Sequence, residues 1–93
     1  MPFYQLKVVT PQGTVYAEEV RHARIPAENG SVGVLAHHAP FVTTSAGGAL
    51  EVDEKSGKRQ IFRVGSGFFT VAHNQAFLLT DSFQTEPSSD PLR

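Results

Sequence analysis

The sequence predicts an all-β protein, an antiparallel β-sandwich of about nine or ten short strands. Apolar and polar residues alternate over several short stretches, as they do in strands with one buried face. Turn signals rich in Gly, Pro, Asn and Ser separate these stretches at intervals of about 8–12 residues. No stretch has a sustained helical apolar period, so no helix is predicted.

The composition is that of one small folded domain. Of the 93 residues, 40% are hydrophobic and 18% charged, which favours a packed core over disorder. The net charge of −1 gives no electrostatic reason to expect nucleic acid as a partner. Because there is no cysteine, a disulfide framework and a thiolate metal site are both excluded.

The amino terminus and the length of the apolar runs bear on the cellular location of the protein. Residues 1–7 lack both a basic start and an apolar h-region, so we expect no secretory signal. The longest apolar runs are a few residues long, far short of a membrane span. We therefore expect a cytosolic or membrane-peripheral protein.

The first third of the chain predicts three strands. Residues 3–9 alternate, and residues 10–13 form a Pro- and Gly-containing turn. Residues 14–17 are short and β-branched, and should pair back on the first strand. The next run, residues 20–25, breaks strict alternation, which indicates a β-bulge near Arg21-His22.

The middle of the chain is one very short strand between two irregular loops. Asn29-Gly30 is a turn signal, and Pro40 pushes Ala39 into an extended conformation. Between them, Gly33 interrupts the apolar residues 32–35 and indicates a close backbone approach. Loops held on a rigid sheet are where binding surfaces tend to lie.

The remaining residues predict a set of hairpins. Strands are expected over residues 41–45, 50–53 and 60–64, with an exposed turn at residues 54–58. A last hairpin, residues 68–81, should turn around Asn74-Gln75. The domain is predicted to span residues 1–83, followed by a flexible tail at residues 84–93 rich in Ser, Pro and acidic residues.

Several of these motifs together resemble one known family. Gly30, Gly33, Val34 and the sequence His38-Ala39-Pro40 are similar to the signature of the ε subunit of the F-type ATP synthase. Further similar segments are residues 4–11, Glu19-Val20, Ile25, residues 65–69 and residues 78–81, so the resemblance covers about residues 4–81.

The chain departs from that family in three places. Ala36-His37 stands where the family usually has Pro-Gly, and residues 45–48 replace a turn similar to Lys-Pro-Gly. Typical members continue into two antiparallel helices, for which these 93 residues have no equivalent. The resemblance therefore does not extend to the functions of those helices, ATP binding among them.

The resemblance implies a non-catalytic central-stalk (rotor) subunit without a cofactor. Such a subunit links the γ subunit to the c-ring and couples proton translocation to ATP synthesis. It is peripheral to the membrane through the rest of the complex, on the cytoplasmic face of the bacterial inner membrane. The alternative from the residues alone is a free-standing β-sandwich module that binds a peptide or a carbohydrate.

The resemblance also implies two contact regions. The c-ring is expected to meet the turn formed by Glu28, Asn29, Gly30 and Ser31. The family position matching Ser31 is often acidic, so Glu28 is the candidate replacement, with a simply solvated turn residue as the alternative. The γ subunit is expected to meet His38, Ala39, Pro40, Phe41, Val42, Thr43 and Phe77.

Two other groups of residues allow competing interpretations. The histidines at 22, 37, 38 and 73 could suggest a metal site, but adjacent strand residues point apart and no carboxylate has ligand spacing. We therefore predict no metal, and expect His38 to anchor its loop by hydrogen bonding or to meet a partner. Phe77 and Ile61, with Phe69 joining them, indicate either an apolar interface or ordinary sheet packing.

Overall fold

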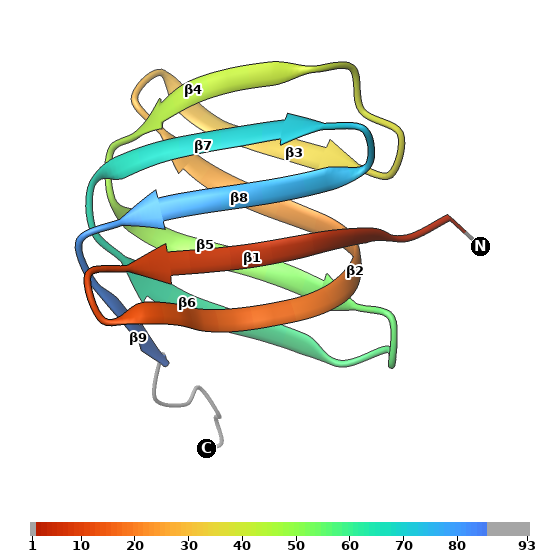
Figure 1. Cartoon of the computed structure of the whole chain (residues 1–93), viewed down its shortest axis with the longest axis horizontal. Coiled ribbons are helices and arrows are strands. Elements are labelled where there is room, and N and C mark those ends of the chain that lie inside the picture. The colour runs from red at the N-terminus through yellow and green to blue at the C-terminus, as the bar shows by residue number, and fades with distance from the viewer. Residues whose placement is uncertain (1, 86–93) are drawn as a thin grey trace.

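A computed structural model describes residues 2–85, and every regular element in that range is a strand (Figure 1). The predicted all-β fold is confirmed, with nine strands. Because residues 2–85 contain no helix, none of them could cross a membrane as one. The strands are β1 (Tyr4–Thr10), β2 (Gly13–Ala27), β3 (Gly30–Leu35), β4 (Phe41–Ser45), β5 (Gly48–Glu54), β6 (Arg59–Val64), β7 (Gly67–Ala72), β8 (Gln75–Thr80) and β9 (Phe83–Thr85).

The strands form two layers that share β2. One layer has the order β1-β8-β7-β4, and it lies toward the viewer in Figure 1. The other has β3 and β5 on either side of β2, followed by β6 and β9. The pairing of β1 with β8 is parallel, whereas the other pairings are antiparallel, so the predicted antiparallel arrangement holds with that one exception.

Strand β2 is longer than the sequence predicts, because residues 14–17 and 20–25 belong to one strand of 15 residues. A straight strand of that length would span about 50 Å. The molecule is only 38 Å in its longest dimension, so β2 has to bend. A register shift between Val20 and His22 confirms the predicted bulge. The first half of β2 pairs with β1, and the second half pairs with β3 and β5.

The core lies between the two layers. Tyr4, Leu6 and Val8 point into it from β1, as the alternation predicts. Burying one large apolar side chain stabilises the fold by about 1.5–3 kcal/mol. The hydroxyl of Tyr4 donates a hydrogen bond of 2.8 Å to the carbonyl of Val34, which satisfies the polar end of this buried side chain. Large side chains with no exposed surface include Phe69, Leu6, Ile25, Leu50 and Leu78.

Three aromatic rings close one end of the sandwich. The ring of Phe62 lies 5.1 Å from that of Tyr16 and 4.7 Å from that of Phe83. Phe83 belongs to β9, which pairs with β6. The predicted tail is therefore wrong for Gln84 and Thr85, which lie in the same strand. The tail prediction for residues 86–93 lies outside the described residues.

The turn between β7 and β8 lies one residue earlier than predicted. Ala72 pairs with Gln75, so the two central residues are His73 and Asn74. Both have positive φ angles, 53° and 63°, as a two-residue hairpin turn of the I′ type requires. Asparagine tolerates that conformation, which explains its place in the turn.

Candidate interaction surfaces

The turn between β2 and β3 is a small exposed projection. Ala27 pairs with Gly30, which leaves Glu28 and Asn29 as the two residues between the strands. Residues 28–31 are all exposed. Gly30 has a φ angle of 114°, a conformation in which a side chain would be strained. Within the described part of the chain, the side chains of Glu28 and Asn29 have no hydrogen bond or ion pair, so the turn is available for contact.

The loop between β3 and β4 is tied to the opposite layer. His37 has a φ angle of 64°, and its backbone N–H donates a hydrogen bond of 2.7 Å to Oδ1 of Asn74. Nδ2 of Asn74 donates another, also 2.7 Å, to the carbonyl of Phe3. One side chain in the β7–β8 turn therefore fixes both this loop and the start of β1.

His38 anchors the same loop from within. Its Nδ1 lies 2.7 Å from the carbonyl oxygen of Ala39, to which it donates. Its ring packs edge-on against the ring of Phe41, with the centroids 5.6 Å apart. This hydrogen bond agrees with the predicted anchoring role of His38, whereas its contact with a partner stays a prediction. Phe41 is partly buried and packs on the core, whereas the side chain of Val42 is 70% exposed.

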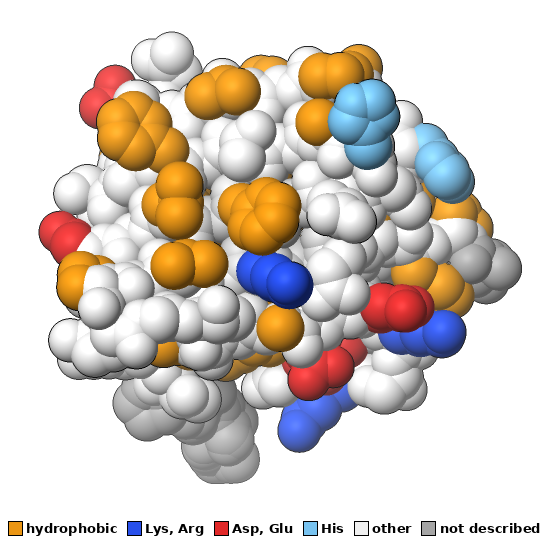
Figure 2. All heavy atoms as spheres, viewed as in Figure 1, with side chains coloured by type: hydrophobic (Ala, Val, Ile, Leu, Met, Phe, Trp, Pro, Cys, Tyr) orange, Lys and Arg blue, Asp and Glu red, His pale blue; other side chains and the backbone are white. Residues whose placement is uncertain are grey.

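The outer side of β7, β8 and β1 carries a continuous row of apolar side chains. Phe68 lies opposite Leu79 in the sheet register, and Leu79 lies opposite Val9. Figure 2 shows hydrophobic side chains gathered over these strands. The side chains of Phe68 and Leu79 are 57% and 46% exposed. Val42 of β4 lies opposite Thr70, which in turn lies opposite Phe77 of β8, so both are on the same side of the sheet. We call Val9, Val42, Phe68, Phe77 and Leu79 the apolar face.

This face corrects part of the sequence prediction. Phe69, expected to be on it, has no exposed surface and pairs with buried Leu78, while its neighbour Phe68 points outward. Ile61 lies on β6 in the other layer, so it does not share a face with Phe77. Two adjacent phenylalanines fit either phase of an alternating pattern, which is why the sequence could not distinguish them.

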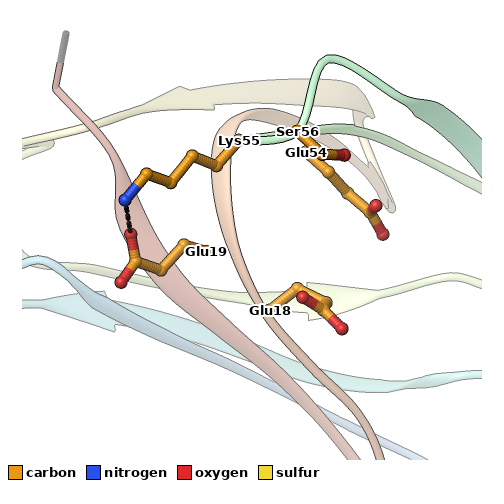
Figure 3. Close-up of a pocket in the computed structure, with 5 residues that line it drawn as sticks. All are labelled: Glu18, Glu19, Glu54, Lys55 and Ser56. Carbon is orange, nitrogen blue, oxygen red and sulfur yellow. Dashed lines mark ion pairs between the residues drawn. The ribbon is translucent and has the colours of Figure 1, made fainter.

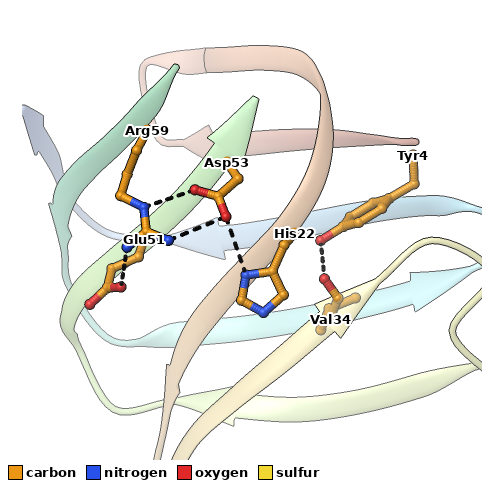
Figure 4. Close-up of polar contacts among 6 residues, drawn as sticks. All are labelled: Tyr4, His22, Val34, Glu51, Asp53 and Arg59. Atoms are coloured by element: carbon orange, nitrogen blue, oxygen red, sulfur yellow. Dashed lines mark hydrogen bonds and ion pairs between the residues drawn. The ribbon is translucent and has the colours of Figure 1, made fainter. Parts of the chain in front are cut away.

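The outer side of the other layer carries a row of charged side chains. Nε of Arg59 lies 2.9 Å from Oδ1 of Asp53, whose Oδ2 is 4.0 Å from Nδ1 of His22 (Figure 4). Arg59 also reaches Glu51, at 3.9 Å. The hydrogen bond and charge of Asp53, and secondarily the charge of Glu51, raise the pKa of the Arg59 guanidinium. Opposite charges thus face one another across β5 and β6, which makes this layer unlike the apolar face.

His22 also explains Gly33. A Cβ atom at position 33 would lie 3.1 Å from Nε2 of His22, tighter than ordinary contact. The sequence predicts a close backbone approach at this glycine, and that prediction is wrong, because the neighbour is a side chain from β2. The register places Gly33 opposite Arg24, two positions along from the pairing of His22 with Leu35 and therefore on the same side of the sheet as His22.

A hollow of about 570 Å³ lies at the turn between β5 and β6 (Figure 3). Several of its polar groups already have partners. Nζ of Lys55 pairs with Glu19 at 3.3 Å, and Oε2 of Glu54 accepts hydrogen bonds from the Tyr16 hydroxyl and the Gln60 amide. Burial, and then the contact with Glu54, raises the pKa of Tyr16. The hollow is lined by Glu18, Glu19, Glu54, Lys55 and Ser56.

The four histidines do not come together. His22 lies in β2, His37 and His38 lie in the β3–β4 loop, and His73 lies in the β7–β8 turn. Among residues 2–85, no three His, Cys, Asp or Glu side chains are grouped so that they could hold a metal ion.

Comparison with known proteins identifies relatives. The family model described as "ATP synthase, Delta/Epsilon chain, beta-sandwich domain" matches residues 3–86. The ATP synthase epsilon chain of Protochlamydia amoebophila is 30% identical over 90 residues, covering 97% of this chain and 61% of that protein. The Bacillus pumilus epsilon chain is 33% identical over 90 residues, covering 97% and 68%. The chain thus spans about two thirds of the length of these relatives.

Solved structures have the same fold. A chain in the cryo-EM structure of the Euglena gracilis mitochondrial ATP synthase (OSCP/F1/c-ring, rotational state 1) superposes with a TM-score of 0.85 at 25% identity. The match covers 91% of this chain and 54% of that one. A chain of the Tetrahymena thermophila mitochondrial ATP synthase central stalk and c-ring gives a TM-score of 0.72 at 13% identity, covering 87% and 65%. At that identity, the second match supports the fold alone.

Proposed function

The chain belongs to the family of the ATP synthase delta/epsilon chain β-sandwich domain, and from this membership we propose that it is a non-catalytic central-stalk subunit of an F-type ATP synthase. In this role it links the γ subunit to the c-ring and couples proton translocation to ATP synthesis. It sits on the cytoplasmic face of the bacterial inner membrane as part of that complex. The family match over residues 3–86 is the observation that carries the proposal, and nothing comparable favours a free-standing peptide- or carbohydrate-binding module.

The apolar face is the proposed contact with γ, together with the adjoining β3–β4 loop. Val42 and Phe68 are the most exposed large apolar residues on that face. A contiguous exposed apolar patch rimmed by polar residues is typical of a protein interface. The loop is also held in one conformation by Asn74, which lowers the entropic cost of binding. The γ contact is proposed at His38, Ala39, Pro40, Phe41, Val42, Thr43 and Phe77, extended by Phe68 and Leu79.

The β2–β3 turn is the proposed contact with the c-ring. It lies at the opposite end of β3 from the His38 loop, and six residues of strand separate two points by about 20 Å. That separation suits a subunit held between two partners. At a wet interface, an ion pair made by Glu28 is worth no more than about 1 kcal/mol, so it would contribute to orientation more than to affinity.

Co-expression with γ tests the central claim. The chain should purify with γ in a stoichiometric complex, whereas a free-standing binding module would purify alone. Because the sequence has no cysteine, a single Ser31→Cys variant can also be crosslinked specifically to cysteines placed in the c-ring loop. Ser56→Cys, in the distant β5–β6 turn, is the matched control. Failure to bind γ, or equal crosslinking from both positions, would contradict the proposal.

A further inference from the structure

We propose that Asn29 is a site of spontaneous deamidation in the folded protein, which converts the β2–β3 turn to a more negatively charged form. Asn29 is exposed and is followed by Gly30, a residue with no side chain to block approach to its backbone nitrogen. A Cβ atom placed on Gly30 would meet no atom within 4 Å, so the surrounding space is open. Within residues 2–85, the Asn29 amide has no hydrogen-bond partner that would hold it in place.

The chemistry needs only water. The backbone nitrogen of Gly30 attacks the side-chain carbonyl carbon of Asn29, and a new C–N bond closes a five-membered succinimide ring. The bond from that carbon to Nδ2 breaks, and ammonia leaves with the proton from the Gly30 amide. Water then adds to either ring carbonyl and opens the ring. Opening at one carbonyl gives aspartate, and opening at the other gives isoaspartate, whose backbone contains one additional methylene.

The position of the turn allows the movement that ring closure requires. Ala27 and Gly30 form the last pair of the β2–β3 ladder, so a small opening there disturbs no other pair of these strands. The ends of ladders and the tips of loops open at the lowest free energy in a folded protein. The folded state therefore gives this asparagine much of the freedom that it has in the unfolded chain.

The other asparagine provides an internal control. The sequence contains only two, and Asn74 is followed by Gln75, whose side chain hinders attack by the backbone nitrogen. Both ends of the Asn74 amide are also engaged, at 2.7 Å to the backbone of His37 and at 2.7 Å to that of Phe3. The structure therefore predicts rapid conversion at Asn29 and retention of the amide at Asn74.

Each product would alter the turn in a different way. Aspartate adds one negative charge beside Glu28 and leaves the backbone unchanged. Isoaspartate lengthens a two-residue connection that the pairing of Ala27 with Gly30 defines, so it also disturbs the start of β3. A consequence for contact with the c-ring follows only if the proposed function is correct, but the reaction itself does not depend on it.

The test is incubation of the purified, folded chain at mildly alkaline pH, followed by tryptic digestion and mass spectrometry. The two asparagines fall in separate tryptic peptides, residues 25–55 and residues 64–93. The peptide of residues 25–55 should gain the mass of one amide-to-acid conversion and separate into two products, the aspartate form and the isoaspartate form. The peptide of residues 64–93 should stay unchanged. Protein isoaspartate methyltransferase, with S-adenosylmethionine as methyl donor, should label one of the two products.

An Asn29→Gln variant is the matched control, because glutamine cannot close the five-membered ring. It should produce no new acidic species on isoelectric focusing, and Asn29→Asp gives the position of the charged product. An acidic species that persists in Asn29→Gln would overturn the assignment. So would an Asn29 that stays intact in the folded chain while converting in urea, or an Asn74 that converts equally fast.

Discussion

The side-chain oxygen of Asn74 accepts a hydrogen bond from the backbone N–H of His37, although the two residues lie 37 positions apart in the sequence. The same side chain donates to the carbonyl of Phe3. Asn74 thus joins three segments that are distant along the chain: the start of β1, the β3–β4 loop and the β7–β8 turn. The position of the His38 loop is consequently set by a residue in another hairpin.

Asn74→Gly tests this connection, because glycine accepts the positive φ angle of the turn but has no side chain. Loss of two hydrogen bonds should lower the free energy of unfolding by about 1–3 kcal/mol in urea titrations. Amide exchange at His37 should accelerate as well. Asn74→Ala should cost about 1 kcal/mol more, since alanine also resists this φ. An Asn74→Gly variant as stable as the parent would show that the side chain does not fix the loop.

Gly33→Ala should reveal the contact with His22. The φ angle of Gly33 lies outside the left-handed region, so alanine fits the backbone there. Reduced freedom of the unfolded chain should then stabilise the protein by about 0.4–1 kcal/mol. In the parent protein, the close contact of the new Cβ atom with Nε2 of His22, at 3.1 Å, should cancel that gain in stability. In a His22→Ala background the contact is absent, so the gain should appear. A double-mutant cycle measures the difference, and additive effects would contradict the contact.

Both tyrosines should resist ionisation until the protein unfolds. Burial, chiefly, raises the pKa of Tyr4 and of Tyr16 above the ordinary 10.0. Above that pH the unfolded chain loses these protons while the folded chain keeps them, so stability is intact below pH 10.0 and falls as the pH rises further. Phenolate absorbance should therefore appear together with loss of the β-sheet circular dichroism. A gradual phenolate titration near pH 10.0 in the folded protein would contradict this expectation.

Val42→Glu should weaken the proposed complex with γ. Val42 is 70% exposed, so the change should leave the fold intact while placing a charge in an apolar contact. Leu35→Glu is the matched control, since Leu35 is 59% exposed but lies on β3 in the other layer. Co-purification with γ measures both. If co-purification with γ fell equally in the two variants, or did not fall in Val42→Glu, γ would have to bind a different face.

The sequence predicted the features that a local pattern can encode. Alternation identified the buried side of β1, and the break in spacing identified the bulge before His22. The sequence also placed a connection on each side of β3, although the first is a two-residue turn at Glu28-Asn29 and Gly30 already belongs to the strand. Where two adjacent residues are both apolar, as at Phe68 and Phe69, alternation cannot show which of them faces the core. Only the register with β8 shows it.

Features that depend on distant partners could not be predicted from the sequence. Strand β9 has three polar or aromatic residues and no alternation of its own, and it forms because β6 and the rings of Tyr16 and Phe62 lie beside it. The role of Asn74 also depends on segments at least 37 positions away. Tertiary pairing of this kind outweighs local propensity.

Strand β2 has a mechanical consequence, because one unbroken length of backbone belongs to both layers. A force applied at the Glu28 end pulls along β2, and the hydrogen bonds to β1, β3 and β5 resist it together as a shear load. Two layers joined only by loops could slide or hinge against each other under the same force. Here the β2–β3 turn is joined to the β1–β2 hairpin by one continuous strand, so the two layers are coupled along the whole length of β2.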